Sequence, residues 1–191
     1  MYEGEESIMA NILIVSGHPR IDDDSVANKT ILEEVARLLP DAQIDRLDAL
    51  YPDYVINVEA EQAKLRAADV VVLQYPLWWY GFPSLLARWM EDVFLHGFSH
   101  GSKGKALRGK KLVASVTVGA PQAYYRADEG GLDRFLAHVE ATCSLTGMEY
   151  AGSVCTFGVP YLNRGDEAAL ADMVERSREH AARLVRFVEG L

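Results

Sequence analysis

Cysteine is scarce in this sequence. Only Cys143 and Cys155 occur among 191 residues, which excludes a disulfide-stapled scaffold and fits the reducing cytoplasm. The first nine residues are acidic and lack the basic start of a secretory signal peptide. We therefore expect residues 1–8 to form a disordered tail and residues 9–191 to fold as one cytoplasmic domain.

Positive charge is also in short supply. The chain has 19 lysines and arginines against 28 acidic residues, a net charge of −9, so nucleic acid is a poor candidate partner. An uncharged run at residues 70–87 approaches the length of a membrane span, but it contains Pro76, Gly81 and Pro83. It predicts a strand, a loop and a helix start, and we expect no membrane insertion.

Several motifs of catalytic sites are missing. The sequence has no G-x-S-x-G nucleophile turn, no Walker loop and no G-x-G-x-x-G dinucleotide turn. His96 and His100 lie close in sequence, but Gly97 and Gly101 disfavour a helix there and no carboxylate or cysteine cluster accompanies them. We therefore predict no metal site.

Apolar runs typical of strands alternate with segments of helical periodicity along the whole chain. The expected strands are residues 11–16, 43–47, 69–74, 111–118 and 148–157, with a polar turn at 20–24. The expected helices are residues 25–39, 59–68, 84–93, 132–145 and 166–188. This pattern predicts an α/β fold: a doubly wound, five-stranded parallel sheet in the order 2-1-3-4-5, with helices on both faces.

In such a sheet, ligands bind beyond the carboxyl ends of the strands, near the switch point between strands one and three. The first strand is followed by His18 and by a helix start that offers free backbone N–H groups to a phosphate. The candidate ligands there are His18, Ser25, Val26, Ala27 and Asn28. The alternative is that Ser25 only caps the helix and that His18 is a turn residue.

Two further loops complete the candidate site. The third strand runs into an aromatic, proline-rich segment suited to stacking on a planar heterocycle, although core or dimer packing also explains some of its rings. The fourth strand ends in small residues that let the backbone approach a ligand closely. Together the three loops favour a flavin nucleotide. The residues are Pro76, Leu77, Trp78, Trp79 and Tyr80 after strand three, and Thr117, Val118, Gly119, Ala120 and Pro121 after strand four.

These segments resemble the NAD(P)H:quinone oxidoreductase family of flavodoxin-like proteins. The resemblance is carried by Gly17-His18-Pro19, by the helix start at residues 25–28 and by the aromatic block at residues 75–94. Residues 50–53 and 94–104 are most similar to the family's bacterial ancillary oxidoreductases of glutathione-gated potassium efflux systems. The resemblance implies a flavodoxin-like homodimer that binds FMN, or FAD as in some relatives, and reduces quinones with NADH or NADPH.

Site roles follow from the resemblance position by position. His18 and residues 25–28 match the family's contacts to the flavin phosphate and ribityl chain, residues 77–80 match its isoalloxazine-facing loop, and residues 118–121 match the flavin pyrimidine edge. Tyr125 falls where animal relatives have the tyrosine of a catalytic tyrosine–histidine pair. Gly131 stands where the histidine is expected, which puts the proton relay of that pair in doubt.

Two functional hypotheses result. The first is a flavin-dependent NAD(P)H:quinone oxidoreductase that transfers two electrons to a quinone or similar flat acceptor by ping-pong kinetics. The second, from the resemblance, is a regulatory flavoprotein subunit of a potassium/proton efflux antiporter. We also expect a two-fold dimer, because residues 89–98 carry more tryptophan and phenylalanine than one helix stripe needs; a loop folded over them within one chain is the alternative.

Overall fold

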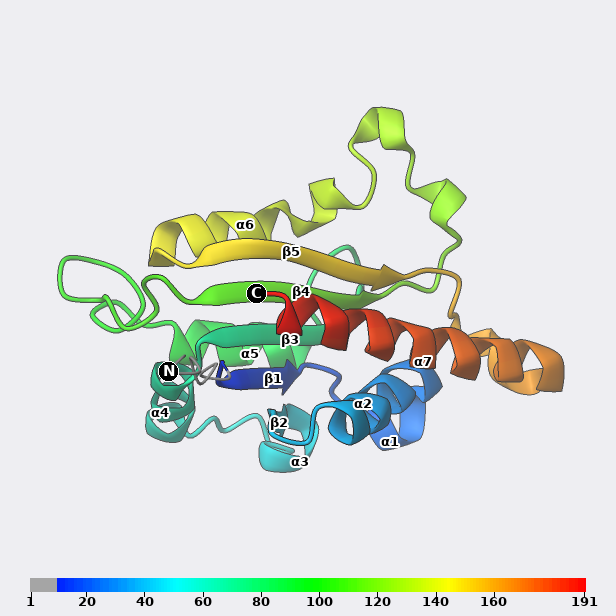
Figure 1. Ribbon diagram of the computed structural model, residues 1–191, viewed down its shortest axis with the longest axis horizontal. Helices are drawn as coiled ribbons and strands as arrows, with labels where there is room; N and C mark the ends of the chain where they lie inside the picture. Colours follow the sequence, from blue (N-terminus) through cyan, green and yellow to red (C-terminus); the bar gives the residue numbers. More distant parts are fainter. Residues whose placement is uncertain (1–9) are drawn as a thin grey trace, which may run out of the picture.

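The computed structural model describes residues 10–191, which form a five-stranded parallel sheet in the order β2-β1-β3-β4-β5 (Figure 1). This is the predicted topology, and each predicted strand is present. The expected disordered tail at residues 1–8 lies outside the described residues. The strands are β1 (Ile12–Ser16), β2 (Gln43–Arg46), β3 (Val70–Pro76), β4 (Lys111–Thr117) and β5 (Glu149–Thr156).

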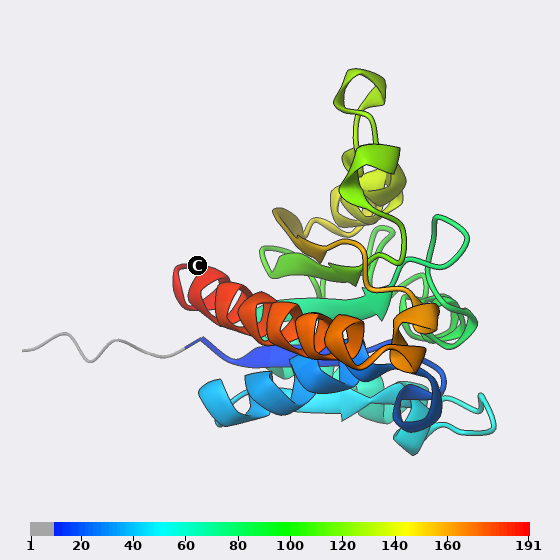
Figure 2. The same ribbon diagram turned by 90° about the vertical axis from the view of Figure 1, so that its right-hand side faces the viewer.

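Helices cover both faces of the sheet, so the strands are buried on two sides. On one face, α2 and α7 lie against each other and pack on Ile14, Val72 and Val113, as Figure 2 shows for the two helices. On the other face, Leu65 and Trp89 belong to a second core cluster. The first pair is α2 (Val26–Leu38) and α7 (Glu167–Glu189), and the second face carries α4 (Val58–Ala67), α5 (Ser84–Val93) and α6 (Asp133–Thr146).

The uncharged run at residues 70–87 divides as the sequence predicts. It supplies the central strand β3, whose seven residues are all buried, then a loop and the start of α5 after Pro83. Consecutive buried valines fit a strand that is covered on both faces. Within residues 10–191, no helix combines the length and apolar character that a membrane span requires.

Several short helical turns in the structure were not predicted from the sequence. The expected polar turn at residues 20–24 is instead one turn of helix, in which Ile21 is buried and its N–H donates to Asp48 Oδ2 at 3.1 Å. The predicted strand 43–47 ends one residue early, because Leu47 starts another single turn. The missed elements are α1 (Ile21–Asp24), α3 (Leu47–Leu50), η1 (Gln122–Tyr124), η2 (Ala127–Glu129) and η3 (Tyr161–Gly165).

The aromatic surplus at residues 89–98 is covered by its own chain. Trp89 is fully buried and its Nε1–H donates to Glu61 Oε2 at 2.8 Å. Phe98 is also buried, with the Arg66 guanidinium 4.9 Å from its ring centre. Both contacts come from α4, so these two rings form no second apolar surface and are covered by a helix, where the alternative expected a loop. The dimer itself stays a prediction.

Gly17 marks a close approach between the end of β1 and α5. A Cβ atom at this position would lie 2.7 Å from Leu86 Cβ and Cδ2. We expect Gly17→Ala to lower the free energy of unfolding by about 1–3 kcal/mol through this overlap. Urea denaturation followed by circular dichroism measures it. Gly165→Ala is the control, because nothing lies within 4 Å of its Cβ position. Equal stability of the two variants would contradict the prediction.

Candidate functional site

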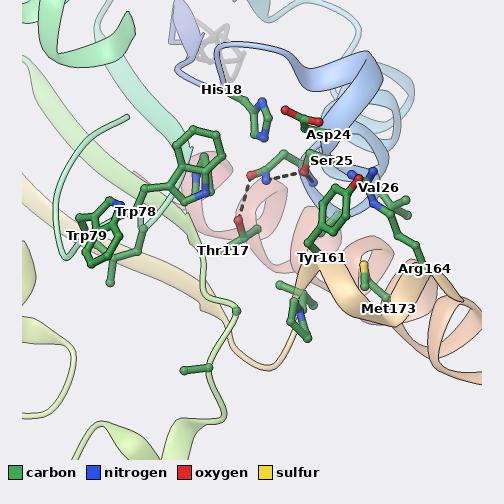
Figure 3. Close-up of a pocket in the computed structure, with 18 of the residues that line it drawn as sticks. His18, Asp24, Ser25, Val26, Trp78, Trp79, Thr117, Tyr161, Arg164 and Met173 are labelled. Atoms are coloured by element: carbon green, nitrogen blue, oxygen red, sulfur yellow. Dashed lines mark hydrogen bonds between the residues drawn. The ribbon is translucent and has the colours of Figure 1, made fainter. Parts of the chain in front are cut away.

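A cavity of about 630 Å³ opens at the carboxyl ends of the strands (Figure 3). Four connections form its walls: those after β1, β3, β4 and β5. The first three are the connections singled out from the sequence. The predicted site residues that line the cavity are His18, Ser25, Val26, Ala27, Asn28, Pro76, Leu77, Trp78, Trp79, Tyr80, Thr117, Gly119, Ala120 and Tyr125.

Two predicted residues do not line this cavity, and others were missed. Val118 is buried in the core beneath it, and Pro121 lines a neighbouring cavity instead. The missed lining residues come from the turn before α2 and from the connection after β5. The rule that ligands bind beyond carboxyl strand ends applies to the fifth strand as well, and would have found the second group. The missed residues are Arg20, Asp24, Val159, Pro160, Tyr161, Arg164 and Met173.

His18 is buried and held in one protonation state. Its ring meets Trp78 edge-on at 5.1 Å, and the backbone N–H of Arg20 donates to its Nδ1 at 3.1 Å. Burial lowers the pKa of the imidazole to about 4. At neutral pH the ring is therefore uncharged, and since Nδ1 accepts, the proton sits on Nε2. His18 can donate one hydrogen bond from Nε2 to a ligand.

Ser25 caps α2, as the alternative interpretation proposed. Its Oγ accepts from the backbone N–H of Asn28 at 3.1 Å and from Asn28 Nδ2 at 2.7 Å. Both bonds use the oxygen as acceptor, so the hydroxyl proton remains available to a ligand. The cap orders the first turn of α2, whose free N–H groups face the cavity end where Val26 and Ala27 lie.

Asn28 joins three elements beneath the cavity. Its Oδ1 accepts from Gln74 Nε2 at 2.6 Å and from Thr117 Oγ1 at 3.0 Å. Figure 3 marks the chain of bonds from Thr117 to Ser25 as dashed lines. The side chain is buried, and both the oxygen and the nitrogen of its amide form hydrogen bonds. Asn28 therefore ties α2 to the ends of β3 and β4, and it also lines the cavity.

The aromatic loop after β3 is strained. Trp79 and Tyr80 have φ angles of 50° and 65°, in the left-handed region, and the N–H of Gly81 donates to Trp78 O at 3.0 Å. Non-glycine residues in this region cost about 1–3 kcal/mol each. The turn directs Trp78 toward His18 while Trp79 is 96% exposed. Tyr80 stacks on Phe135 at 4.7 Å, which ties the loop to α6.

Tyr125 stands on the wall formed by the connection after β4. Its ring lies 5.5 Å from Phe157 and 5.7 Å from Phe135. Burial raises the pKa of its hydroxyl, so the group is protonated at neutral pH. Gly131 has a φ of 58°, a left-handed conformation that glycine adopts without strain. His18 is the one histidine among the lining residues.

Metal-binding side chains do not cluster in the part of the chain that the structure describes. No cluster of three or more His, Cys, Asp or Glu side chains within residues 10–191 could hold a metal ion. The rings of His96 and His100 lie 5.6 Å apart, and His100 Nδ1 is bonded to Ser99 Oγ at 2.9 Å. Both cysteines are unpaired, and burial raises the pKa of the Cys143 thiol to about 11. A thiolate is therefore disfavoured at Cys143.

The fold agrees with that of known proteins. The family model described as "Flavodoxin-like fold" matches residues 10–181. The structure of general stress protein 14 from Treponema denticola, in complex with FMN, is 31% identical, with a TM-score of 0.81 over 93% of this chain and 99% of that one.

Two further solved structures are similar. One is described as a thermophilic tryptophan halogenase from Streptomycin violaceusniger, with 31% identity and a TM-score of 0.75 over 88% of this chain and 96% of that one. The other, described as an NADPH-quinone reductase from P. pentosaceus, is 23% identical, with a TM-score of 0.68 over 90% of this chain and 97% of that one. At that identity the likeness extends to the fold alone.

Proposed function

Because the chain belongs to the family with the flavodoxin-like fold, we propose that its cavity binds FMN and that the protein is a flavin-dependent NAD(P)H:quinone oxidoreductase, or acts on a related flat acceptor. The observation that carries this proposal is the convergence of an anion-binding helix start and an aromatic loop on one cavity of about 630 Å³. The FMN complex of the 31% identical stress protein supports the choice of cofactor.

The residues present fit FMN at both ends. His18 Nε2–H, the Ser25 hydroxyl and the first-turn N–H groups of α2 provide donors for a phosphate. Trp78, Leu77 and the small residues after β4 provide flat apolar and backbone surface for a ring system. A neutral His18 suits this role, because a donor that keeps its proton from pH 5 upward holds the phosphate without a change of charge.

In this proposal the main role of the protein is to position the bound molecules, and proton transfer by its side chains is a smaller part of that role. Bound FMN would supply the redox chemistry, accepting a hydride from NAD(P)H and passing two electrons to the acceptor. Leu77, Val159 and Met173 exclude water from the cavity walls. Gly119 and Ala120 let backbone N–H groups approach a ring that gains negative charge. Tyr125 is protonated at neutral pH and can donate a hydrogen bond to an oxygen atom of the electron acceptor at that wall.

The absorption spectrum of the purified protein tests the cofactor. We expect flavin bands in the near-ultraviolet and blue, and mass spectrometry of the released compound identifies FMN or FAD. A colourless protein that binds neither flavin would remove the basis of the proposal.

Initial rates with NAD(P)H and menadione test the reaction. Parallel lines in double-reciprocal plots support a shared site used in turn by donor and acceptor, and intersecting lines contradict it. Because one similar structure is described as a tryptophan halogenase, tryptophan with chloride, NAD(P)H and dioxygen as the oxidant is a second substrate mixture. A chlorinated product without acceptor-dependent oxidation of NAD(P)H would favour that activity instead.

His18→Ala separates cofactor binding from chemistry. Loss of the Nε2–H donor is expected to raise the dissociation constant of FMN by about 10- to 100-fold, the equivalent of about 1–3 kcal/mol. Turnover with FMN in excess should stay close to that of the parent. Tyr125→Phe is the matched control on the opposite wall, with unchanged FMN affinity and modestly lower turnover. If His18→Ala binds FMN as tightly as the parent but no longer oxidises NAD(P)H, the phosphate end has been assigned wrongly.

Two finer expectations stay predictions from the sequence. Light scattering of the flavin-loaded protein at micromolar concentration tests the two-fold dimer, and a monomer mass contradicts it. Recovery of a potassium/proton antiporter from membranes by the tagged protein tests the regulatory-subunit hypothesis.

A further inference from the structure

A second cavity, of about 470 Å³, lies on the other side of the connection after β4. Its walls are the 121–122 segment, the last residues of β5 with the two that follow, and one face of α7. Arg176, Glu179 and Arg183 come from that face, where a spacing of seven residues places both arginines on the same side of the helix. None of these residues has a role in the function proposed above.

The two cavities share a wall. Gly158 N–H donates to Ala120 O at 3.0 Å, and Val159 N–H donates to Val118 O at 3.1 Å, so the strand ends of β4 and β5 continue as a bonded pair. Ala120 and Val159 face the first cavity, while Gly158 faces the second. This bonded pair of segments therefore separates the two cavities.

Both arginines are held in place by the backbone they cover. Arg183 donates from one terminal nitrogen to Cys155 O at 3.0 Å and to Thr156 Oγ1 at 2.9 Å. Arg176 donates to Gly158 O at 3.4 Å and to Phe157 O. Each guanidinium has five N–H donors, so these bonds fix the fork and leave further donors toward the cavity. Arg176 also pairs with Asp172 at 3.4 Å, whereas no carboxylate of the described residues lies within ion-pair distance of Arg183.

We propose that this second cavity binds a phosphate monoester, and that its source is the 2′-phosphate by which NADPH differs from NADH. The inference rests on the function proposed above, since it assigns a binding site to the electron donor. Guanidinium groups that are already held in place suit a phosphate dianion, which accepts charge-assisted hydrogen bonds from their remaining N–H groups. Two arginines line this one cavity, although acidic residues outnumber basic ones in the chain and its net charge is −9. Glu179 opposes the two arginines and Asp172 pairs with Arg176, so Arg183 is the arginine of this cavity that has no carboxylate of the described residues within ion-pair distance.

Calorimetry with 2′,5′-ADP and 5′-AMP, together with NADPH and NADH kinetics, tests the site. Arg183→Gln keeps a polar side chain but removes the positive charge. We expect it to raise the dissociation constant of 2′,5′-ADP and the KM for NADPH by about 10- to 30-fold, and to leave the KM for NADH within about twofold. Glu179→Gln should tighten 2′,5′-ADP binding several-fold. The control, Arg186→Ala, removes an exposed arginine of the same helix that lies outside the cavity.

The outcomes separate this inference from the proposed function. If 2′,5′-ADP and 5′-AMP bind equally well, or if Arg183→Gln affects NADH as much as NADPH, the site does not read the 2′-phosphate. Competition by inorganic phosphate with an unchanged KM for NADPH in Arg183→Gln would assign the cavity to free phosphate and overturn the donor assignment. A protein without flavin or NAD(P)H oxidation would refute the proposed function, and the calorimetric comparison would still decide whether the cavity selects the 2′-phosphate.

Discussion

Replacing Asn28 with alanine is expected to lower the free energy of unfolding by about 3 kcal/mol and to weaken FMN binding by about 100-fold. Asn28 makes buried hydrogen bonds with Gln74 and Thr117 and one with Ser25. Its loss leaves the Gln74 amide and the Thr117 hydroxyl without their acceptor in a buried place, where each unsatisfied group costs about 1–3 kcal/mol. FMN affinity falls because the cap of α2 and the ends of β3 and β4 are no longer held in register.

Urea denaturation and FMN titration of the variant measure the two effects. Asn57→Ala is the matched control, since Asn57 caps α4 through a single bond from Ala60 N–H at 3.1 Å, on the face away from α2. We expect that control to lose about 1 kcal/mol and to bind FMN as the parent does. If Asn28→Ala is no less stable than Asn57→Ala, the network under the cavity does not hold the site together.

Acid is expected to destabilise the flavin-free protein steeply below pH 6.5 because of two buried histidines. His180 lies between Ser115 and Thr156, with Nε2 2.8 Å from Ser115 Oγ and Nδ1 2.9 Å from Thr156 Oγ1. Burial lowers the pKa of His180 to about 3 and that of His18 to about 4. In the unfolded chain each imidazole takes up a proton near pH 6.5, while in the folded chain it stays neutral.

The direction of this pH dependence follows from the number of protons that the folded and unfolded states bind. Between pH 6.5 and the folded-state pKa values the unfolded state binds more protons, so the free energy of unfolding falls as the pH falls. From pH 7 to pH 5 the loss is about 2 kcal/mol for each of the two histidines. Urea denaturation at a series of pH values measures it. His180→Asn should remove the His180 share of this dependence, and half-buried His138 contributes in the same sense because burial lowers its pKa as well. An unchanged pH profile in His180→Asn would contradict the assignment.

Periodicity and the position of strand ends were enough to predict the sheet and most of the residues that line the cavity. β3 could be read directly, because a run of buried valines between a charged helix and a proline-rich loop fits few other structures. The loops after β1, β3 and β4 then had to meet at one sheet edge. Their meeting point is a consequence of parallel topology and requires no knowledge of side-chain contacts.

Contacts between segments that are distant along the chain could not be predicted from the sequence. Whether Val118 faced the cavity or the core depended on one residue of strand phase, and a strand places successive side chains on opposite faces. The bonds of Asn28 to Gln74 and Thr117 join residues separated by 46 and 89 positions, and no local pattern predicts them. The burial of Trp89 depends on Glu61, whose carboxylate accepts from the indole across 28 positions.

The packing of α7 on α2 has a consequence for the order of events during synthesis. Ile31 of α2 shares its core cluster with Ala181 and Leu184, so the apolar face of the first long helix stays open until the last helix has been made. The cavity likewise draws its walls from His18 through Met173. A chain emerging amino-terminus first therefore cannot complete the pocket until α7 has left the ribosome. Loading of the proposed cofactor must follow the emergence of α7, and a truncated product missing α7 would expose the apolar face of α2 to chaperones and proteases.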